Sequence, residues 1–114
     1  MRIAVFQSDI EWCNVDANLS KMEHVLRQVS GAADILLLPE MFTTGFCVEA
    51  DSLDENIGGK TKETLLTWSK EYDVAISGSF IAFDAGRYFN RAFFVTPEGE
   101  FVSYDKRHLF SIGA

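Results

Sequence analysis

The clearest feature of the hydrophobic pattern is an unbroken aliphatic run at residues 35–38, Ile-Leu-Leu-Leu. A run without polar alternation predicts a strand that is covered on both faces. Pro39 ends the run, because proline has no N–H to give to a strand ladder, and Glu40 follows at once. The pattern thus predicts a glutamate at the carboxyl end of a buried strand, where open α/β sheets usually bind their ligands.

Two helical stripes flank this strand. Before it, apolar residues recur at helical intervals after a polar cap at Asn14 or Asp16, and Gly31 is placed to end the helix. After it, residues 43–60 are expected to form a long loop, and Thr61 is expected to cap a second helix. The apolar positions of the two helices are Leu19, Met22, Val25, Leu26 and Val29, and then Leu65, Trp68 and Tyr72.

Runs of β-forming residues complete an α/β element order of strand, helix, strand, helix and three more strands. The first strand-helix-strand unit is expected to be parallel and right-handed. Two helices can cover one face of such a sheet, so the other apolar face would need a partner. The expected strands cover residues 2–7, 34–38, 74–83, 88–96 and 101–104, with tight turns at 84–87 and 97–100.

Composition narrows the class of protein. The 114 residues suffice for one domain, and 47% of them are hydrophobic, as expected for a globular chain. A net charge of −7 argues against nucleic acid and anionic membranes as partners, because both require clustered Lys and Arg. No apolar run is long enough to span a membrane. Two cysteines, Cys13 and Cys47, do not make a disulfide framework, which favours a reducing cytoplasm.

Glu40 and Lys106 are the main candidates for chemistry. An isolated Glu or Lys is most often a solvated surface group. Glu40, however, is flanked by Met41 and Phe42, and apolar surroundings favour a proton on a carboxylate, so it can act as a proton acceptor near neutral pH. Lys106 follows an apolar strand, and an ammonium at that strand end could stabilise an oxyanion at the same rim. We expect the strands that precede Glu40 and Lys106 to be neighbours in the sheet. Asn90, within a predicted strand, is assigned a structural role.

Other motifs are absent or incomplete. The stretch Gly58-Gly59-Lys60-Thr61 resembles the end of a phosphate loop, but Asp54 stands where that motif needs its first glycine. The two histidines, His24 and His108, lack the spacing of a zinc site. No G-x-S-x-G elbow occurs. Cys13 and Cys47 have no basic neighbour that would activate a thiol, so we expect neither to be a nucleophile.

Two motifs resemble the carbon–nitrogen hydrolase (nitrilase) superfamily, and most closely its omega-amidase branch. They are residues 36–46, LLLPEMFTTGF, and residues 104–110, YDKRHLF. The first strand, the segment Tyr88-Phe89-Asn90-Arg91 and the turn at 97–99 fit the resemblance too, so it extends over nearly the whole chain. The resemblance implies a four-layer α-β-β-α sandwich of which residues 1–114 form the first half, the N-terminal portion of a single domain.

The resemblance also implies a Glu-Lys-Cys triad that hydrolyses the terminal amide of 2-oxoglutaramate-like acids to acid and ammonia. Glu40 would be the general base, Lys106 the oxyanion-stabilising lysine, and the attacking thiol would form a thioester that water then hydrolyses. Phe42 and His108 would contact the small-molecule amide. No metal or cofactor is implied, and the complete protein is expected to be a homodimer or larger homo-oligomer.

The nucleophilic cysteine of the superfamily follows its lysine, so the resemblance places it beyond residue 114, where the C-terminal portion would lie. We therefore expect the 114-residue chain by itself to be inactive and prone to associate. Two other functions are compatible with the same residues. One is another amidase of the superfamily, such as an N-carbamoyl amine hydrolase, and the other is a non-catalytic truncated module.

Overall fold

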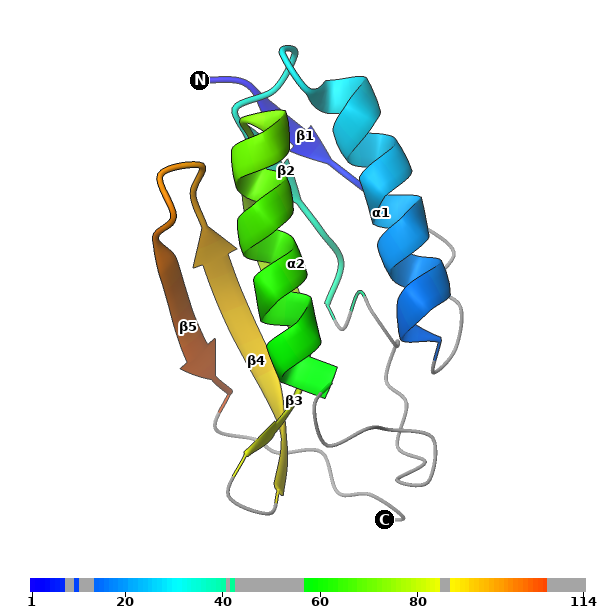
Figure 1. Cartoon of the computed structure of the whole chain (residues 1–114), viewed down its shortest axis with the longest axis vertical. Coiled ribbons are helices and arrows are strands. Elements are labelled where there is room, and N and C mark those ends of the chain that lie inside the picture. The colour runs from blue at the N-terminus through cyan, green and yellow to red at the C-terminus, as the bar shows by residue number, and fades with distance from the viewer. Residues whose placement is uncertain (8–9, 11–13, 41, 43–56, 85–86, 107–114) are drawn as a thin grey trace.

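A computed structural model of the chain describes residues 1–7, 10, 14–40, 42, 57–84 and 87–106. It contains one five-stranded sheet and two helices, in the predicted order (Figure 1). The α/β fold class is therefore confirmed. The elements are β1 (Ile3–Val5), α1 (Val15–Val29), β2 (Ile35–Leu37), α2 (Ile57–Tyr72), β3 (Ala75–Asp84), β4 (Arg87–Val95) and β5 (Phe101–Asp105).

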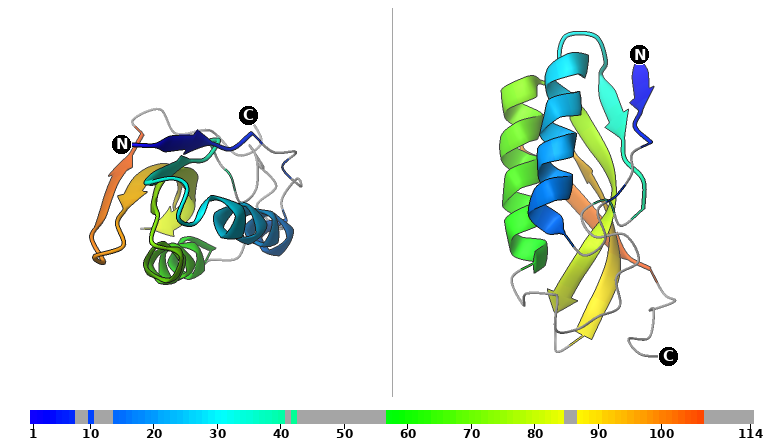
Figure 2. Two further views of the ribbon diagram at one scale, coloured as in Figure 1. Left: turned by 90° about the horizontal axis from the view of Figure 1, so that it is seen from above. Right: turned by 90° about the vertical axis from the view of Figure 1, so that its right-hand side faces the viewer.

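The five strands lie side by side in the order in which they occur along the chain. β1, β2 and β3 are parallel, whereas β3–β4 and β4–β5 are antiparallel pairs. The two helical connections move along the sheet in one direction, so right-handed crossovers place both helices on the same face. Figure 2 shows α1 and α2 side by side on that face and the other face without a helix.

Local sequence sets both ends of α1 as expected. The side chain of Asn14 accepts a hydrogen bond from the backbone N–H of Ala17 at 3.1 Å, which satisfies one of the free donors of the first turn. At the other end, Gly31 has a φ of +82°, a left-handed conformation that glycine adopts without steric cost.

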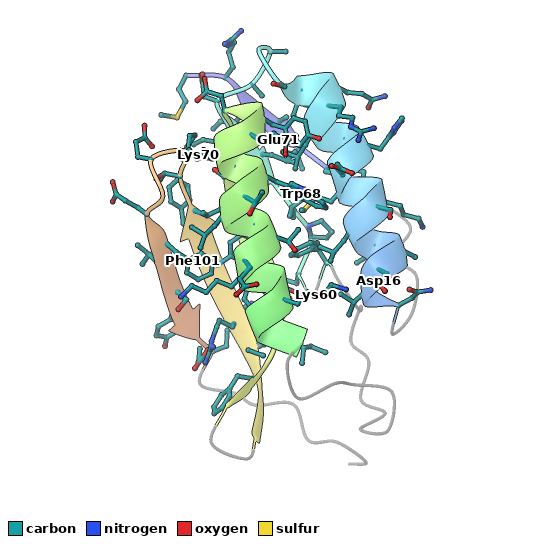
Figure 3. The ribbon with its side chains drawn as sticks, viewed as in Figure 1. Asp16, Lys60, Trp68, Lys70, Glu71 and Phe101 are labelled. Atoms are coloured by element: carbon teal, nitrogen blue, oxygen red, sulfur yellow. The ribbon has the colours of Figure 1, made fainter. Side chains whose placement is uncertain are left out.

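The second helix begins earlier than predicted. α2 starts at Ile57, so Thr61 is not its cap but lies inside the helix with no exposed surface. Two adjacent glycines lower helix propensity, which is why this stretch was expected to be a loop. Burial of Thr61 in the core outweighs that preference. The Nζ of Lys60 also donates to Asp16 on α1 at 2.6 Å (Figure 3), but this ion pair is exposed and adds little.

One row of residues shows how the inner face of the sheet forms the core. Strand register places one residue from each strand in line, and the three central members, Leu36, Ile76 and Val95, have no exposed surface. Met22 and Leu26 of α1 and Leu65 of α2 belong to the same buried cluster. The complete row is Ala4, Leu36, Ile76, Val95 and Phe101.

The next row, on the outer face, is open. It runs through Val5, Leu37, Ser77, Phe94 and Val102, and its four apolar members are between 37% and 66% exposed. The aliphatic run at 35–38 was expected to be covered on both faces. Within the described residues it is covered on the helix side only, because no described helix or strand packs on the outer face at this run.

Gly78 allows the chain beyond β2 to lie close against β3. A Cβ built at Gly78 would lie 3.0 Å from the Cβ of Leu38 and 3.4 Å from Cε1 of Phe93. The first distance is tighter than most Cβ contacts in proteins, and Leu38 is held by its own backbone. Glycine at this position therefore sets the path of the residues that lead to Glu40.

We expect Gly78→Ala to lower the free energy of unfolding of the whole protein by about 1–3 kcal/mol, the usual cost of overpacking. Chemical denaturation measures this loss. Ser103→Ala, at an exposed position of β5, is the control and should change stability by less than about 0.5 kcal/mol. A Gly78→Ala protein as stable as the wild type would contradict this account of the close approach.

Candidate active site

Backbone hydrogen bonds on either side of Glu40 hold it against β3. The N–H of Leu38 donates to the carbonyl of Ser77 at 2.8 Å, and that of Phe42 donates to the carbonyl of Ser79 at 3.1 Å. The side chains of Leu38 and Phe42 are both buried in the core. Leu38 and Phe42 lie two residues to either side of Glu40. Because both are anchored in this way, the backbone at Glu40 has a fixed position although β2 ends at Leu37.

Lys106 is held by β4, at the opposite edge of the β3–β4 hairpin from Glu40. Its N–H donates to the carbonyl of Asn90 at 3.0 Å, one residue beyond the last pair of the β4–β5 ladder, Arg91 with Asp105. Paired residues of an antiparallel ladder share a face, and successive residues alternate. Asn90 and Lys106 therefore face each other on the outer side of the sheet.

The two candidate residues meet. The Nζ of Lys106 donates to Oε1 of Glu40, which forms an ion pair between residues 66 positions apart in the chain. β2 and β5 run in the same direction, so their carboxyl ends lie at one rim, as predicted. The expectation that these strands are neighbours is wrong, because β3 and β4 lie between them. Contact is possible because both segments continue past their strands along the flanks of the long β3–β4 hairpin.

The surroundings of Glu40 are more open than its sequence neighbours indicated. Its side chain is 53% exposed, and that of Lys106 is 38% exposed. Phe42 turns inward, with its ring centroid 6.0 Å from that of Phe93, and so leaves Glu40 on the outer side. An ion pair this exposed contributes only about 0–1 kcal/mol to stability. The arrangement is better suited to chemistry, because it sets a proton acceptor beside a cation.

Similarity to known proteins gives independent evidence for the family of this chain. Residues 2–114 match the family described as carbon-nitrogen hydrolase. The chain belongs to the carbon–nitrogen hydrolase family. It is 35% identical to the omega-amidase YafV of Yersinia enterocolitica over 96% of this chain, and 30% identical to the 2-oxoglutaramate amidase of Bacillus subtilis over the same share.

Solved structures agree with this assignment. The fold matches XC1258 from Xanthomonas campestris, a CN-hydrolase superfamily protein, with a TM-score of 0.85 and 34% identity over 96% of this chain. An amidase from Nesterenkonia, at 22% identity and a TM-score of 0.84, supports the fold alone. The chain covers 42% of the length of both the Yersinia relative and XC1258, and 44% of the Bacillus relative. The structure is thus a partial nitrilase-type fold.

An ion pair that sequence reasoning missed fixes the end of β5 in this carbon–nitrogen hydrolase chain. Arg91 donates from Nε to Oδ1 of Asp105 at 2.6 Å and from NH2 to Oδ2 at 3.0 Å. The hydrogen bond from Arg91 lowers the pKa of Asp105 below its usual value; burial partly opposes this effect, and the guanidinium charge lowers the pKa by a smaller amount. Because Asp105 immediately precedes Lys106, this two-bond contact fixes the strand end from which Lys106 extends.

The other predicted site residues have different outcomes. Phe42 lies in the core with 4% of its surface exposed, so any contact with substrate stays a prediction. His108, Cys13 and Cys47 lie outside the described residues. The part of the chain that the structure describes holds no cluster of three potential metal ligands. Its two helices, of 15 and 16 residues, are not long and apolar enough to cross a membrane.

The lowered pKa of Asp105 predicts an acid-dependent loss of stability. A carboxyl whose pKa is lower in the folded state stabilises the fold above its unfolded pKa, near 3.8, and this contribution is lost as pH falls through the folded pKa. Asp105→Asn should therefore lose less stability than the wild type between pH 5 and pH 2. Denaturant titrations of the whole protein at several pH values measure the difference.

Arg91→Lys is the matched comparison, because it keeps the charge but not the two-bond geometry. We expect its acid-dependent loss to lie between those of the wild type and Asp105→Asn. Equal pH dependence in the wild type and Asp105→Asn would show that the pair contributes nothing to stability.

Proposed function

We propose that the whole protein hydrolyses small carboxamides and that Glu40 and Lys106 are two of its catalytic groups. The observation that supports this most strongly is the ion pair itself, which brings together two residues far apart in the chain at an exposed rim. Stability alone does not account for such a pair. Relatives named omega-amidase and 2-oxoglutaramate amidase agree with hydrolysis of a terminal amide.

The proposed reaction has two stages. A cysteine thiol from the part of the protein beyond residue 114 attacks the amide carbon while Glu40 takes its proton. Lys106 stabilises the negative charge on the carbonyl oxygen, and ammonia leaves with a proton to give a thioester. Glu40 then takes a proton from water as the water attacks the thioester, which releases the acid and restores the thiol.

The substrate class follows from the named relatives rather than from the site. We propose a small 2-oxo dicarboxylic acid monoamide resembling 2-oxoglutaramate, with N-carbamoyl amines as the competing class. The proposal also includes a homo-oligomer in the cytoplasm; two cysteines without a disulfide framework support the cytoplasm.

The outer face of the sheet has a place in the same proposal. The whole protein would cover it with its remaining chain, so that residues 1–114 form one half of a single domain. The support is the row of four exposed apolar residues that crosses the sheet, with Tyr104 and Ile3 exposed on the same face. A continuous apolar surface of this kind is uncommon on a free monomer.

Replacing either proposed catalytic group should abolish most activity. We expect Glu40→Gln and Lys106→Met each to lower kcat/KM by a factor of about 10²–10⁴ in the whole protein. The first change removes the proton acceptor, and the second removes the positive charge that stabilises the oxyanion. Ammonia release from 2-oxoglutaramate and from N-carbamoyl amines measures the activity. Cys13→Ser and Cys47→Ser are the controls and should keep most of it.

Folded Glu40→Gln and Lys106→Met proteins with wild-type rates would overturn the assignment of these two residues. A preference for N-carbamoyl amines would leave the two roles intact and exclude the proposed substrate class. A folded wild-type protein that releases no ammonia from any amide in the panel would instead favour a non-catalytic role.

A charge on the outer face tests whether the rest of the protein covers it. We expect Val102→Lys to destabilise the whole protein by about 1–3 kcal/mol, because the ammonium would be buried without a partner. Thr67→Lys, at an exposed position of α2, is the control and should have little effect. Equal stability of the two variants in chemical denaturation would mean that the outer face is open in the whole protein.

A further inference from the structure

Asn90 carries a buried hydrogen-bond acceptor that has no partner. The residue is 7% exposed, and its Oδ1 is the buried side-chain oxygen or nitrogen that lacks a hydrogen bond in the part of the chain described. More than about 90% of buried polar atoms in proteins are hydrogen-bonded, because leaving one without a partner costs free energy. An exception on a central strand therefore points to a partner that binds in another state of the protein.

The position of Asn90 identifies that partner. Its backbone carbonyl accepts the N–H of Lys106 at 3.0 Å, which makes the two residues a directly opposed pair across β4 and β5. Side chains of such a pair have their Cβ atoms about 4.5–5.5 Å apart on one face of the sheet. Arg91 and Asp105, the preceding pair, form their ion pair on the other face, so Asn90 and Lys106 share the outer face.

The ammonium of Lys106 has more N–H donors than the contact described for it uses. An ammonium has three N–H donors, and the one contact described for this group goes to Oε1 of Glu40. That contact depends on the negative charge of the carboxylate. When Glu40 takes a proton during the proposed reaction, its attraction for the ammonium falls, although the cation must stay in place to stabilise the oxyanion.

We propose that Asn90 is a positioning residue, whose Oδ1 holds the ammonium of Lys106 while Glu40 is protonated. A neutral amide oxygen suits this task, because it accepts a hydrogen bond without neutralising the charge that the oxyanion needs. The proposal rests on the proposed function for the timing of the contact. The contact itself can be tested without any enzymatic reaction.

A role in packing alone makes a different prediction. Asn90 pairs across β3–β4 with Ile81, which has no exposed surface, so Asn90→Leu places an apolar side chain beside an apolar neighbour. Replacing an unpartnered buried acceptor with an apolar group of similar shape is often neutral for stability. Asn90→Leu should thus keep the fold and lose the contact, whereas a packing residue would affect stability and leave Lys106 unchanged.

The test measures hydrogen exchange at the Lys106 ammonium by ¹H–¹⁵N NMR in the whole protein, with the signal assigned by its loss in Lys106→Arg. Glu40→Gln imitates the protonated carboxyl. In Glu40→Gln we expect the ammonium to stay protected, and in Glu40→Gln/Asn90→Leu we expect its exchange to speed up about tenfold or more, because a hydrogen bond to a charged group is lost. Glu40→Gln/Asn90→Asp keeps an acceptor oxygen and should restore protection.

Asn18→Leu is the matched control, because Asn18 is equally buried, at 3% exposure, but lies on α1 on the other side of the sheet. Glu40→Gln/Asn18→Leu should exchange like Glu40→Gln alone. Equal exchange with and without Asn90 would overturn the proposal, and so would an equal effect of the Asn18 control. If Asn90→Leu prevents folding, the hydrogen-exchange rate of the Lys106 ammonium in Asn90→Asp can be compared with that in Asn90→Ala instead.

Kinetics separate this inference from the function on which it rests. With Glu40 intact, Asn90→Leu should lower kcat on 2-oxoglutaramate by about 10- to 100-fold while KM changes little, because only a step after binding is affected. An unchanged kcat would overturn the role in catalysis. If the wild type releases no ammonia but the exchange results hold, the contact is supported and the proposed function fails.

Discussion

The geometry of the candidate site depends on the pairing of β3 with β4. This hairpin has nine residue pairs, more than any other strand pairing in the sheet. Its two outer edges offer the carbonyls of Ser79 and Asn90, which accept the N–H groups of Phe42 and Lys106. Backbone hydrogen bonds, and not the exposed ion pair, thus fix where Glu40 and Lys106 lie. The ion pair can break during a reaction without loss of the frame that holds its members.

Much of the fold could be predicted from the pattern of apolar residues. Every strand and both helices were anticipated, because alternation and helical stripes are local properties. The start of α2 was not, since the contacts that hold Lys60 and Thr61 in a helix come from α1 and the core. Local propensity carries no information about such contacts. The same is true of the 3.0 Å approach that favours glycine at position 78.

The members of the candidate site were predictable from the sequence, but its geometry was not. Glu40 and Lys106 could be found because each follows an apolar run that ends abruptly. Their contact across two intervening strands depends on how far each segment continues along the hairpin, which the pattern does not encode. The pair Arg91–Asp105 could not be found by counting outward from the expected turn at 97–100, because that count sets Arg91 opposite Lys106, one residue away from the register of the structure. The missing partner of Asn90 becomes visible only when burial is known.

The sheet order also bears on how the chain reaches its fold. β3, β4 and β5 follow one another through short turns, so their pairing closes small loops and costs little chain entropy. Adding β1 and β2 to this sheet requires two helical crossovers, one between β1 and β2 and one between β2 and β3, and contacts of that kind form more slowly. The hairpin that carries Asn90 can therefore exist before the segment that carries Glu40 arrives. A chain that refolds from the unfolded state would form the cationic side of the candidate site first and add its carboxylate only when the parallel strands dock.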